Sequence, residues 1–426
     1  MNGGVLRLNS TGAIPGGILP TGGTSALTIN GGVVELTVNS GAFFKRDLGT
    51  GAEQVQITGG ASGFSCSAGS TRTVNFNDDA HLITWGDPAF DPSILVLQET
   101  TASSEPLNLL NPIDLGASAR TVAVKASTAG LSGTLSGEGG SLIKLGSGAL
   151  TLGNNVNTFD GGLFIKAGAV KLKGTGTSLG NGTVTLGDSI MGEDATLNFT
   201  SNGNDGNTFT NSFLISGGLG TRTISSLDMA SDANFTISGA VSMSNDLTLL
   251  TPTGDGSLKF SGGLTGTGNL TLNANASGAP VLQTNPVNMI GTITNSGTGT
   301  NTTTISAVIG TNVIGVVQNS TNSVLKLSGV NTYRGTTTVN AGTLEIATDN
   351  CLNQASSVSI ATDAKMYLNF TGTNTIKCLT LGGNEMPKGV YGASELGGTA
   401  FFTDGGSGKL NVTESGLLRG TVIIVY

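Results

Sequence analysis

Apolar and polar residues alternate in short runs along most of the chain. In residues 33–38, 183–186, 196–199 and 270–272, aliphatic or aromatic side chains alternate with Thr, Asn or Glu. Strict alternation is typical of a half-buried β-strand. Gly, Asn or Asp bound each run and supply turns. Because apolar residues rarely recur at the spacing of an amphipathic helix, the pattern predicts an all-β chain of many short strands.

Two stretches of the chain repeat one another. Both contain Asn-Thr-aromatic-x-Gly and then Ala-Gly-x-aliphatic-x-aliphatic, within residues 144–186 and 326–346. The spacing is also the same, because Asn157 precedes Gly168 by eleven residues and Asn331 precedes Gly342 by eleven. Short strands with Gly and Asn turns are compatible with a sandwich, a barrel or a solenoid. Length decides, since a single sandwich or barrel rarely exceeds about 250 residues and this chain has 426. We therefore predict a parallel β-helix, a single elongated rod, over residues 1–415, with about 20 residues per turn.

Composition agrees with a narrow repeated core. The chain has 68 Gly, 5% aromatic and 11% charged residues, with 37% hydrophobic residues. Such a chain can fill stacked turns with small aliphatic side chains, and its hydrophobicity argues against disorder. The net charge of −8 and the pI of 4.7 argue against a nucleic-acid partner and against anionic membranes.

Few residues suggest metal or redox chemistry. The cysteines, Cys66, Cys351 and Cys378, are odd in number and far apart, so we interpret them as small buried hydrophobes, although Cys351 and Cys378 would pair if neighbouring turns brought them together. We expect no cofactor and no metal. No stretch approaches 18 consecutive apolar residues, so no membrane-spanning helix is expected. The start of the chain does not resemble a signal peptide, so an exported protein would be a processed piece or a fragment of a longer chain.

The two repeated stretches resemble the autotransporter-associated β-strand repeat of bacterial passenger domains. The resemblance rests on KLGSGALTL at 144–152, NTF at 157–159 and AGAVKL at 167–172, and on KLSGVNTYRG at 326–335 with AGTLEI at 341–346. The segment SLGNGTVTL at 178–186 looks like the family's usual continuation. Residues 48–56, 63–64, 82–86, 111–115, 381–383, 386–393 and 406–410 are similar to large, exported surface proteins of Planctomycetes and Verrucomicrobia. The resemblance implies a right-handed parallel β-helix, export and a surface location, and it implies no reaction.

The densest polar and aromatic cluster lies in residues 78–92. It contains His81, Trp85, Asp87 and Asp91. One interpretation is a sugar-binding ledge on which Trp85 stacks. The alternative is an irregular loop whose Trp covers the edge of a turn, and we favour it. Three other kinds of site are conceivable. Glycosidases use paired carboxylates, and a Ser-His-Asp site would need His81, the only histidine. Residues 202–207 resemble one diluted copy of a calcium-binding motif. A structural role is favoured for each.

The last eleven residues are apolar. A β-helix has open ends that must be capped, and residues 416–426 are predicted to form a C-terminal strand or cap. Residues 421–426 are β-prone and uncharged, and such a segment tends to pair with another strand. We expect it either to fold back on its own chain or to dock head-to-tail on a neighbouring molecule. The candidate self-association residues are Thr421, Val422, Ile423, Ile424, Val425 and Tyr426.

These observations predict a non-catalytic, extracellular structural protein of the bacterial cell surface. The expected partner is another copy of the chain, in filaments or a matrix layer. The alternative is an adhesin or passenger module that displays loops 78–92 and 384–405 to a glycan or a surface. A polysaccharide-active enzyme is the third and least favoured hypothesis.

Overall fold

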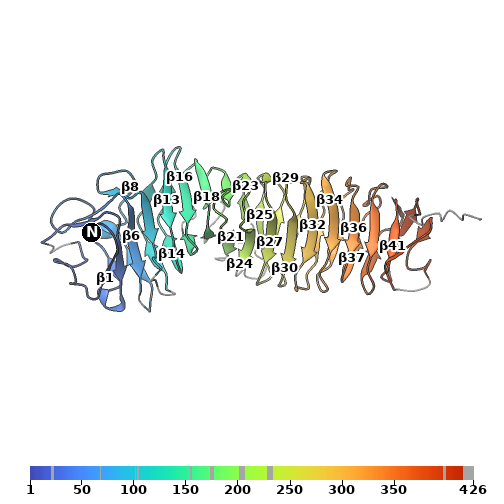
Figure 1. Ribbon diagram of the computed structural model, residues 1–426, viewed down its shortest axis with the longest axis horizontal. Coiled ribbons are helices and arrows are strands. Elements are labelled where there is room, and N and C mark those ends of the chain that lie inside the picture. The colour runs from blue at the N-terminus through green and yellow to red at the C-terminus, as the bar shows by residue number, and fades with distance from the viewer. Residues whose placement is uncertain are drawn as a thin grey trace, which may run out of the picture. The chain divides into compact units, whose positions relative to one another are not determined.

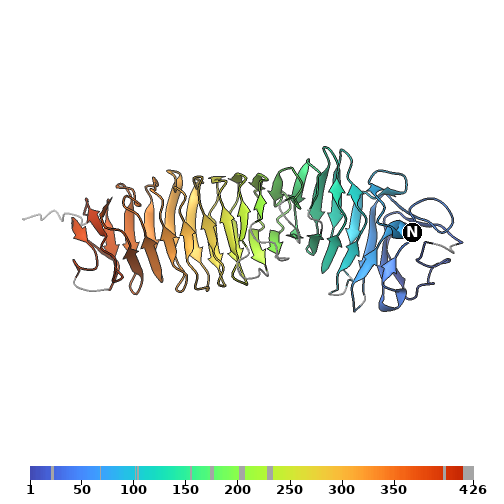
Figure 2. The ribbon, with the colours of Figure 1, turned by 180° about the vertical axis from the view of Figure 1, so that it is seen from behind.

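The chain folds as two compact units, Met1–Leu227 (unit 1) and Asp228–Tyr426 (unit 2). The computed structural model describes residues 1–20, 24–67, 69–100, 102, 105–153, 156–172, 177–200, 207–227, 234–396 and 400–415. Within each unit, short strands follow one another in chain order and lie side by side, as Figures 1 and 2 show from opposite sides. The solenoid predicted for residues 1–415 thus divides between two units.

Unit 1 is built mainly from two long parallel sheets. The first contains β1 (Val5–Leu8), β3 (Val33–Leu36), β6 (Ala61–Cys66), β10 (Ile94–Leu97), β13 (Ala119–Ala123), β16 (Ser141–Leu145), β18 (Gly162–Ile165), β20 (Val184–Leu186) and β23 (Phe213–Ile215). The second contains β4 (Phe43–Phe44), β7 (Arg72–Val74), β11 (Leu107–Leu109), β14 (Thr128–Leu131), β17 (Ala149–Leu152), β19 (Gly168–Leu172), β21 (Ala195–Thr200) and β24 (Arg222–Leu227). The remaining elements of unit 1 are short: β2 (Leu27–Ile29), β5 (Val55–Thr58), β8 (Ile83–Thr84), β9 (Phe90–Asp91), β12 (Ile113–Asp114), β15 (Leu135–Ser136), β22 (Thr208–Phe209) and the 3-10 turns η1 (Val38–Ser40) and η2 (Phe76–Asp78).

Unit 2 also has two long rows of parallel strands. One row contains β27 (Leu247–Thr251), β30 (Leu270–Ala274), β32 (Gly291–Ser296), β34 (Val313–Gln318), β36 (Thr336–Val339), β38 (Ser357–Ile360) and β41 (Leu379–Leu381). The other contains β25 (Asn234–Ile237), β28 (Ser257–Phe260), β31 (Pro280–Leu282), β33 (Thr303–Ile305), β35 (Leu325–Leu327), β37 (Thr343–Ile346) and β39 (Lys365–Leu368). The strands β26 (Val241–Met243) and β29 (Leu264–Gly266) form a further parallel pair.

Alternation of residue types explains these strands. In β27, β30 and β32 buried and partly exposed residues alternate, and the aliphatic side chains other than Leu250 lie on the buried side. Each turn pairs in register with the next, so Leu247 lies beside Leu270 and Leu270 beside Ile293. The core is therefore a stack of like side chains, and the prediction of an all-β parallel solenoid is confirmed. The right-handed winding stays a prediction.

The turns of unit 1 differ in length. Val5 pairs with Val33 and Ala61 pairs with Ile94, whereas Ser141 pairs with Gly162 after a much shorter stretch of chain. In unit 2 the spacing between paired strands is more uniform, as between Leu247 and Leu270. The expected length of about 20 residues per turn therefore underestimates the first turns most.

Antiparallel strands follow the parallel stack in unit 2. β42 (Asn384–Glu385) pairs antiparallel with β41, and β43 (Gly389–Tyr391) pairs antiparallel with β44 (Lys409–Val412), which continues in parallel with β40 (Thr373–Ile376). A reversed edge strand with Glu385, Pro387 and Lys388 at or beside it discourages further strand addition. The described residues 384–396 and 400–405 of the segment predicted to be displayed thus contribute to a cap, while residues 416–426 lie outside the described part of the chain.

Candidate functional site

The asparagine of each repeat occupies the same place in the solenoid. Asn157 and Asn331 are buried. Asn157 Oδ1 accepts a hydrogen bond of 2.8 Å from the backbone N–H of Leu135, and Asn157 Nδ2 donates to Ser178 O at 2.7 Å. A buried amide that satisfies one donor and one acceptor on neighbouring turns holds three successive turns together.

The second copy reproduces this geometry. Asn331 Oδ1 accepts from the N–H of Ile309 at 2.8 Å, and Asn331 Nδ2 donates to Cys351 O at 2.9 Å. In both copies the N–H that donates to the asparagine lies 22 residues upstream, at Leu135 for Asn157 and at Ile309 for Asn331. The repeated asparagine is therefore a tie between turns.

The repeated glycine and aromatic residue are also structural. Gly168 and Gly342 have φ of 67° and 62°, and a Cβ there would lie 2.4 Å from Gly146 O or 2.2 Å from Ser320 O. Only glycine fits such a corner without strain. Phe159 and Tyr333 are fully buried, and burial raises the pKa of the Tyr333 phenol. The aromatic position of each repeat therefore lies inside the solenoid.

The lysines that open the two repeated stretches have opposite environments. Lys144 lies on the inner side of β16 and is fully buried, and its Nζ donates to the carbonyls of Leu145, Gly146 and Ala167 at 2.9, 2.7 and 3.1 Å. Three acceptors suit an ammonium group, whereas burial lowers the pKa of Lys144 to about 7. Lys326 instead points outward from β35, and its Nζ lies 2.9 Å from Glu345 Oε1.

Arg222 is a buried cation that bonds extensively to the backbone. It is 1% exposed and donates to five backbone carbonyls of two loops, those of Asp188, Glu193, Ser216, Gly217 and Thr221. Burial lowers the pKa of its guanidinium, while the nearby acidic side chains of the same loops oppose that shift. The side chain thus fixes both loops against the turn.

Arg46 and Arg72 act in the same way near the start of unit 1. Arg46 is fully buried and donates to the carbonyls of Pro15, Gly17 and Ser25 at 2.7, 2.7 and 2.9 Å. Arg72 donates to Thr37 O and Val38 O, both at 3.2 Å. These cations were not predicted from the sequence. Alternation was the available signal, because Arg72 shares the inward side with Val74 and Arg222 with Ile224.

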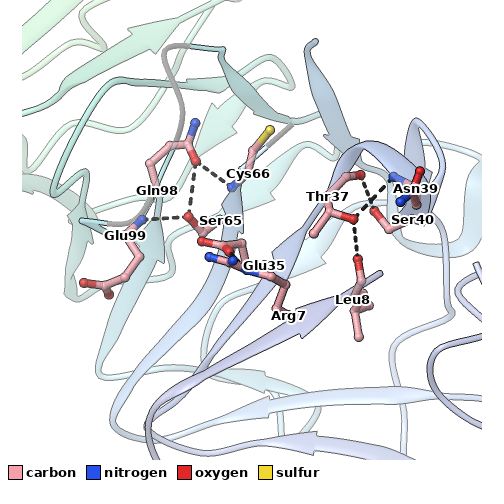
Figure 3. A network of polar contacts seen from close by, with 10 residues as sticks. All are labelled: Arg7, Leu8, Glu35, Thr37, Asn39, Ser40, Ser65, Cys66, Gln98 and Glu99. Carbon is pink, nitrogen blue, oxygen red and sulfur yellow. Dashed lines mark hydrogen bonds and ion pairs between the residues drawn. The ribbon is translucent and has the colours of Figure 1, made fainter. Parts of the chain in front are cut away.

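A polar network joins the first turns of unit 1, as Figure 3 shows. The buried carboxylate of Glu35 lies 2.5 Å from Nε of Arg7, which is half exposed. On later turns Gln98 Oε1 accepts from the N–H of Cys66 at 2.8 Å, and Ser65 Oγ accepts from the N–H of Glu99 at 3.0 Å. Polar side chains here satisfy backbone groups between turns.

Trp85, a candidate ligand contact in the loop 78–92, is buried, with 2% of its surface exposed. Its indole Nε1 donates to Pro92 O at 3.1 Å, its ring meets Phe90 edge-on, and the Arg120 guanidinium lies 5.7 Å from the ring centre. A sugar ring has no access to the face of the buried indole. The interpretation that Trp85 stacks on a sugar therefore does not fit this structure. The interpretation of Trp85 as cover for a turn agrees with its burial.

The other residues of this loop are more exposed. His81 and Asp87 lie beside a hollow of about 180 Å³, together with Asn77 and Thr84. Asp91 is half exposed and its Oδ1 lies 3.3 Å from Arg120 Nη1. The structure therefore brings His81 and Asp87 to one hollow and holds Asp91 in an ion pair. Ligand contact by these three residues stays a prediction.

Metal and thiol chemistry have little support in the described part of the chain. No group of three or more His, Cys, Asp or Glu there could hold a metal ion. Cys66, Cys351 and Cys378 are free thiols, and burial raises the pKa of Cys351 to about 12. No described helix is both long and apolar enough to span a membrane. The calcium-like residues 202–206 and the candidate self-association residues Thr421 to Tyr426 lie outside the described residues.

Comparison with known families identifies the repeated stretches. Residues 142–172 and 323–346 match the passenger-associated transport repeat. No curated protein and no solved structure matches the chain. The wider likeness to surface proteins of Planctomycetes and Verrucomicrobia stays a prediction. The matched segments contain both asparagine ties and both glycine corners, and the chain therefore carries two passenger-associated transport repeats within a parallel β-solenoid.

Proposed function

We propose that the chain is a non-catalytic, exported structural element of the bacterial cell surface. The observation that carries this proposal is the equivalence of Asn157 and Asn331, because the same position of each repeat ties neighbouring turns together and faces the interior. Passenger-associated transport repeats occur in autotransporter passengers, which supports export to the surface.

Other reactive side chains are also engaged in holding the fold. Lys144 and Arg222 donate to backbone carbonyls, and Tyr333 shares a hydrogen bond of 2.5 Å with Thr337. A chain that uses its few charged and hydroxyl groups to hold its fold is suited to a structural role. We infer a stiff spacer or layer component whose partner is another copy of itself.

Head-to-tail filaments require a contact at the ends of the solenoid. The reversed strand β42 discourages pairing at the described cap, so such a contact would need the segment Thr421 to Tyr426. Deleting residues 421–426 should shorten or abolish filaments seen by electron microscopy. Filaments of unchanged length and yield would leave the tail without a role in assembly.

The adhesin alternative draws support from the hollow beside His81 and Asp87. A glycan array with the purified chain distinguishes the two functions. A selective signal that disappears in the Asp87→Ala variant would favour an adhesin, whereas an unselective response supports the structural role.

Immunogold labelling of intact cells tests the main proposal. We expect label on the outer surface, and we expect a thinner or missing surface layer in a deletion strain. Label confined to the cell interior would overturn it. So would loss of a polysaccharide-degrading activity in the deletion strain, if the Asp87→Asn/Asp91→Asn double variant reproduced that loss.

A further inference from the structure

One outward face of unit 2 carries a column of hydroxyl groups. The strands β27, β30, β32, β34, β36, β38 and β41 pair in register, so one outward side chain of each lies beside that of the next. In order along the stack, the column consists of Thr248, Thr271, Thr294, Val317, Thr338, Ser359 and Thr380. All seven side chains are partly exposed. At about 4.8 Å between strands, the column is roughly 29 Å long. We call this side of the seven strands the hydroxyl face.

The hydroxyl face differs in charge from the other long face of unit 2. None of its seven strands contains a charged residue. The seven strands of the other row, whose outward side we call the charged face, contain Lys259, Lys326, Glu345 and Lys365. Depletion of charge marks the centre of protein interfaces more reliably than hydrophobicity does. The hydroxyl face and the charged face thus differ in chemistry, although their strands have the same spacing.

Exposed apolar side chains on the hydroxyl face favour a protein partner. Ile290 and Ile314 lie at the start of β32 and β34 and are 51% and 61% exposed, and the pairing register shifts where β34 meets β32. Exposed branched side chains of this size suit an apolar contact.

The period of the face favours a second copy of the same chain. A flat sheet of many strands is typically stabilised by stacking on another sheet, and identical side-chain ladders interdigitate because their repeats match. The burial patterns of the seven strands leave 14 side chains outward, fewer than the roughly 20–30 residues that each side of a standard interface uses. The face is therefore of a size that suits a weak, concentration-dependent contact.

We propose that two copies of the chain pair through their hydroxyl faces, related by a two-fold axis. A self-complementary patch pairs in this isologous way. Val317 is the fourth of the seven column members, so the axis passes near Val317 and brings it to its equivalent in the other copy. Thr248 of one copy then faces Thr380 of the other. This contact rests on the proposed structural role, it names the surface used for lateral association, and it is independent of residues 421–426.

Cysteine cross-linking tests the register of the pair. In a Cys378→Ser background, which removes the half-buried thiol at the end of this face, Val317→Cys should give a covalent dimer under copper–phenanthroline oxidation. Thr248→Cys and Thr380→Cys should each remain largely uncross-linked alone and cross-link when mixed. Thr304→Cys on the charged face is the matched control and should not form a covalent dimer. A cross-link of the control equal to that of Val317→Cys would overturn the proposal.

Charge substitution tests the contact without oxidation. Thr294→Lys places an ammonium group near the centre of the face and should raise the dimer dissociation constant at least tenfold in sedimentation equilibrium. Thr304→Lys should leave it unchanged, and circular dichroism checks that both variants fold. Deleting residues 421–426 should leave the pairing intact. The inference would be overturned if the wild-type chain were monomeric at every concentration, or if it bound crystalline polysaccharide through Thr294 as a monomer. Either result would leave the surface location open to its own test.

Discussion

The two units build the same kind of solenoid from turns of different regularity. In unit 1 the in-register partner of Ala61 is Ile94 and that of Ser141 is Gly162, so the turns shorten along the chain. They lengthen again where Val184 pairs with Phe213. In unit 2 the stacked turns vary less, because the spacing between Leu270 and Ile293 is close to that between Leu325 and Leu344. A longer turn encloses a wider cross-section, and the two units fill it differently.

Aromatic side chains fill the wide turns. The rings of Phe44 and Phe64 lie 4.9 Å apart and those of Phe64 and Phe76 lie 5.8 Å apart, all within the long first turns. The next long turn contains the pair Phe199 and Phe209, at 4.8 Å. A narrow core of small aliphatic residues, expected from composition, therefore describes the shorter turns and misses the aromatic cluster at the start of unit 1.

The two units also satisfy their buried polar groups differently. Among the described residues, the buried cations Arg46, Arg72, Lys144 and Arg222 all lie in unit 1, whereas the buried polar side chains in the described part of unit 2 are all neutral. In unit 2, Asn295 Nδ2 donates to Gln318 Oε1 at 2.7 Å on the next turn. Regular turns form hydrogen bonds with each other along their length. Irregular corners leave carbonyls without a backbone donor, and a long cation reaches several of them.

Removing Arg222 should be the most damaging test of this comparison. Arg222→Met removes five hydrogen bonds to backbone carbonyls, although Thr221 O keeps the N–H of Ala195 as a donor, and we expect a loss of about 3–5 kcal/mol in the free energy of unfolding. Urea denaturation measures it, and hydrogen exchange should increase first in residues 187–194 and 216–221. Arg334→Met, at an exposed position of unit 2, is the control. A cost below about 0.5 kcal/mol, which is typical of a neutral surface substitution, would show that the loops do not depend on the cation.

The repeat asparagines should matter equally in both units. Asn157→Ala and Asn331→Ala each remove the acceptor of a buried N–H and one donor to a carbonyl of the next turn, so each should cost about 1–3 kcal/mol. Chemical denaturation of each variant checks this, with the exposed Asn181→Ala as a control expected within about 0.5 kcal/mol of the wild type. A large effect at only one of the two positions would contradict the equivalence of the repeats.

The pH dependence of Lys144 tests the buried cations of unit 1 in a second way. Burial lowers the pKa of Lys144 to about 7, whereas the unfolded side chain keeps the ordinary value of 10.5. Between these values the unfolded chain binds a proton that the folded chain does not, so this group makes the free energy of unfolding rise as the pH increases from about 7 toward 10.5. Lys144→Met lacks this rise. Denaturation of both proteins across this range isolates the difference, and equal slopes would show that the three carbonyls keep the ammonium charged.

Much of the solenoid was predictable from local sequence. Strict alternation in residues 270–272 placed Leu270 and Leu272 inside and Thr271 outside, as the structure has them. The shared spacing of the repeats indicated that Asn157 and Asn331 play one role. Trp85 was harder to assign, because the sequence around it does not reveal that Phe90 and Arg120 pack against its ring. Contacts between turns join residues that are far apart in the chain, and alternation contains no information about them.

By itself, the sequence determined which side chains face inward, because a strand alternates sides at every residue whatever surrounds it. That rule places Leu325 and Leu327 inside and Lys326 outside, and it places Lys144 inside with Leu142. Only the tertiary structure decided what those inward cations meet. The length of each turn sets which carbonyls lie at the corner, and register between distant turns sets which residues stack. For the same reason, the in-register hydroxyl column of unit 2 exists only once the turns are stacked.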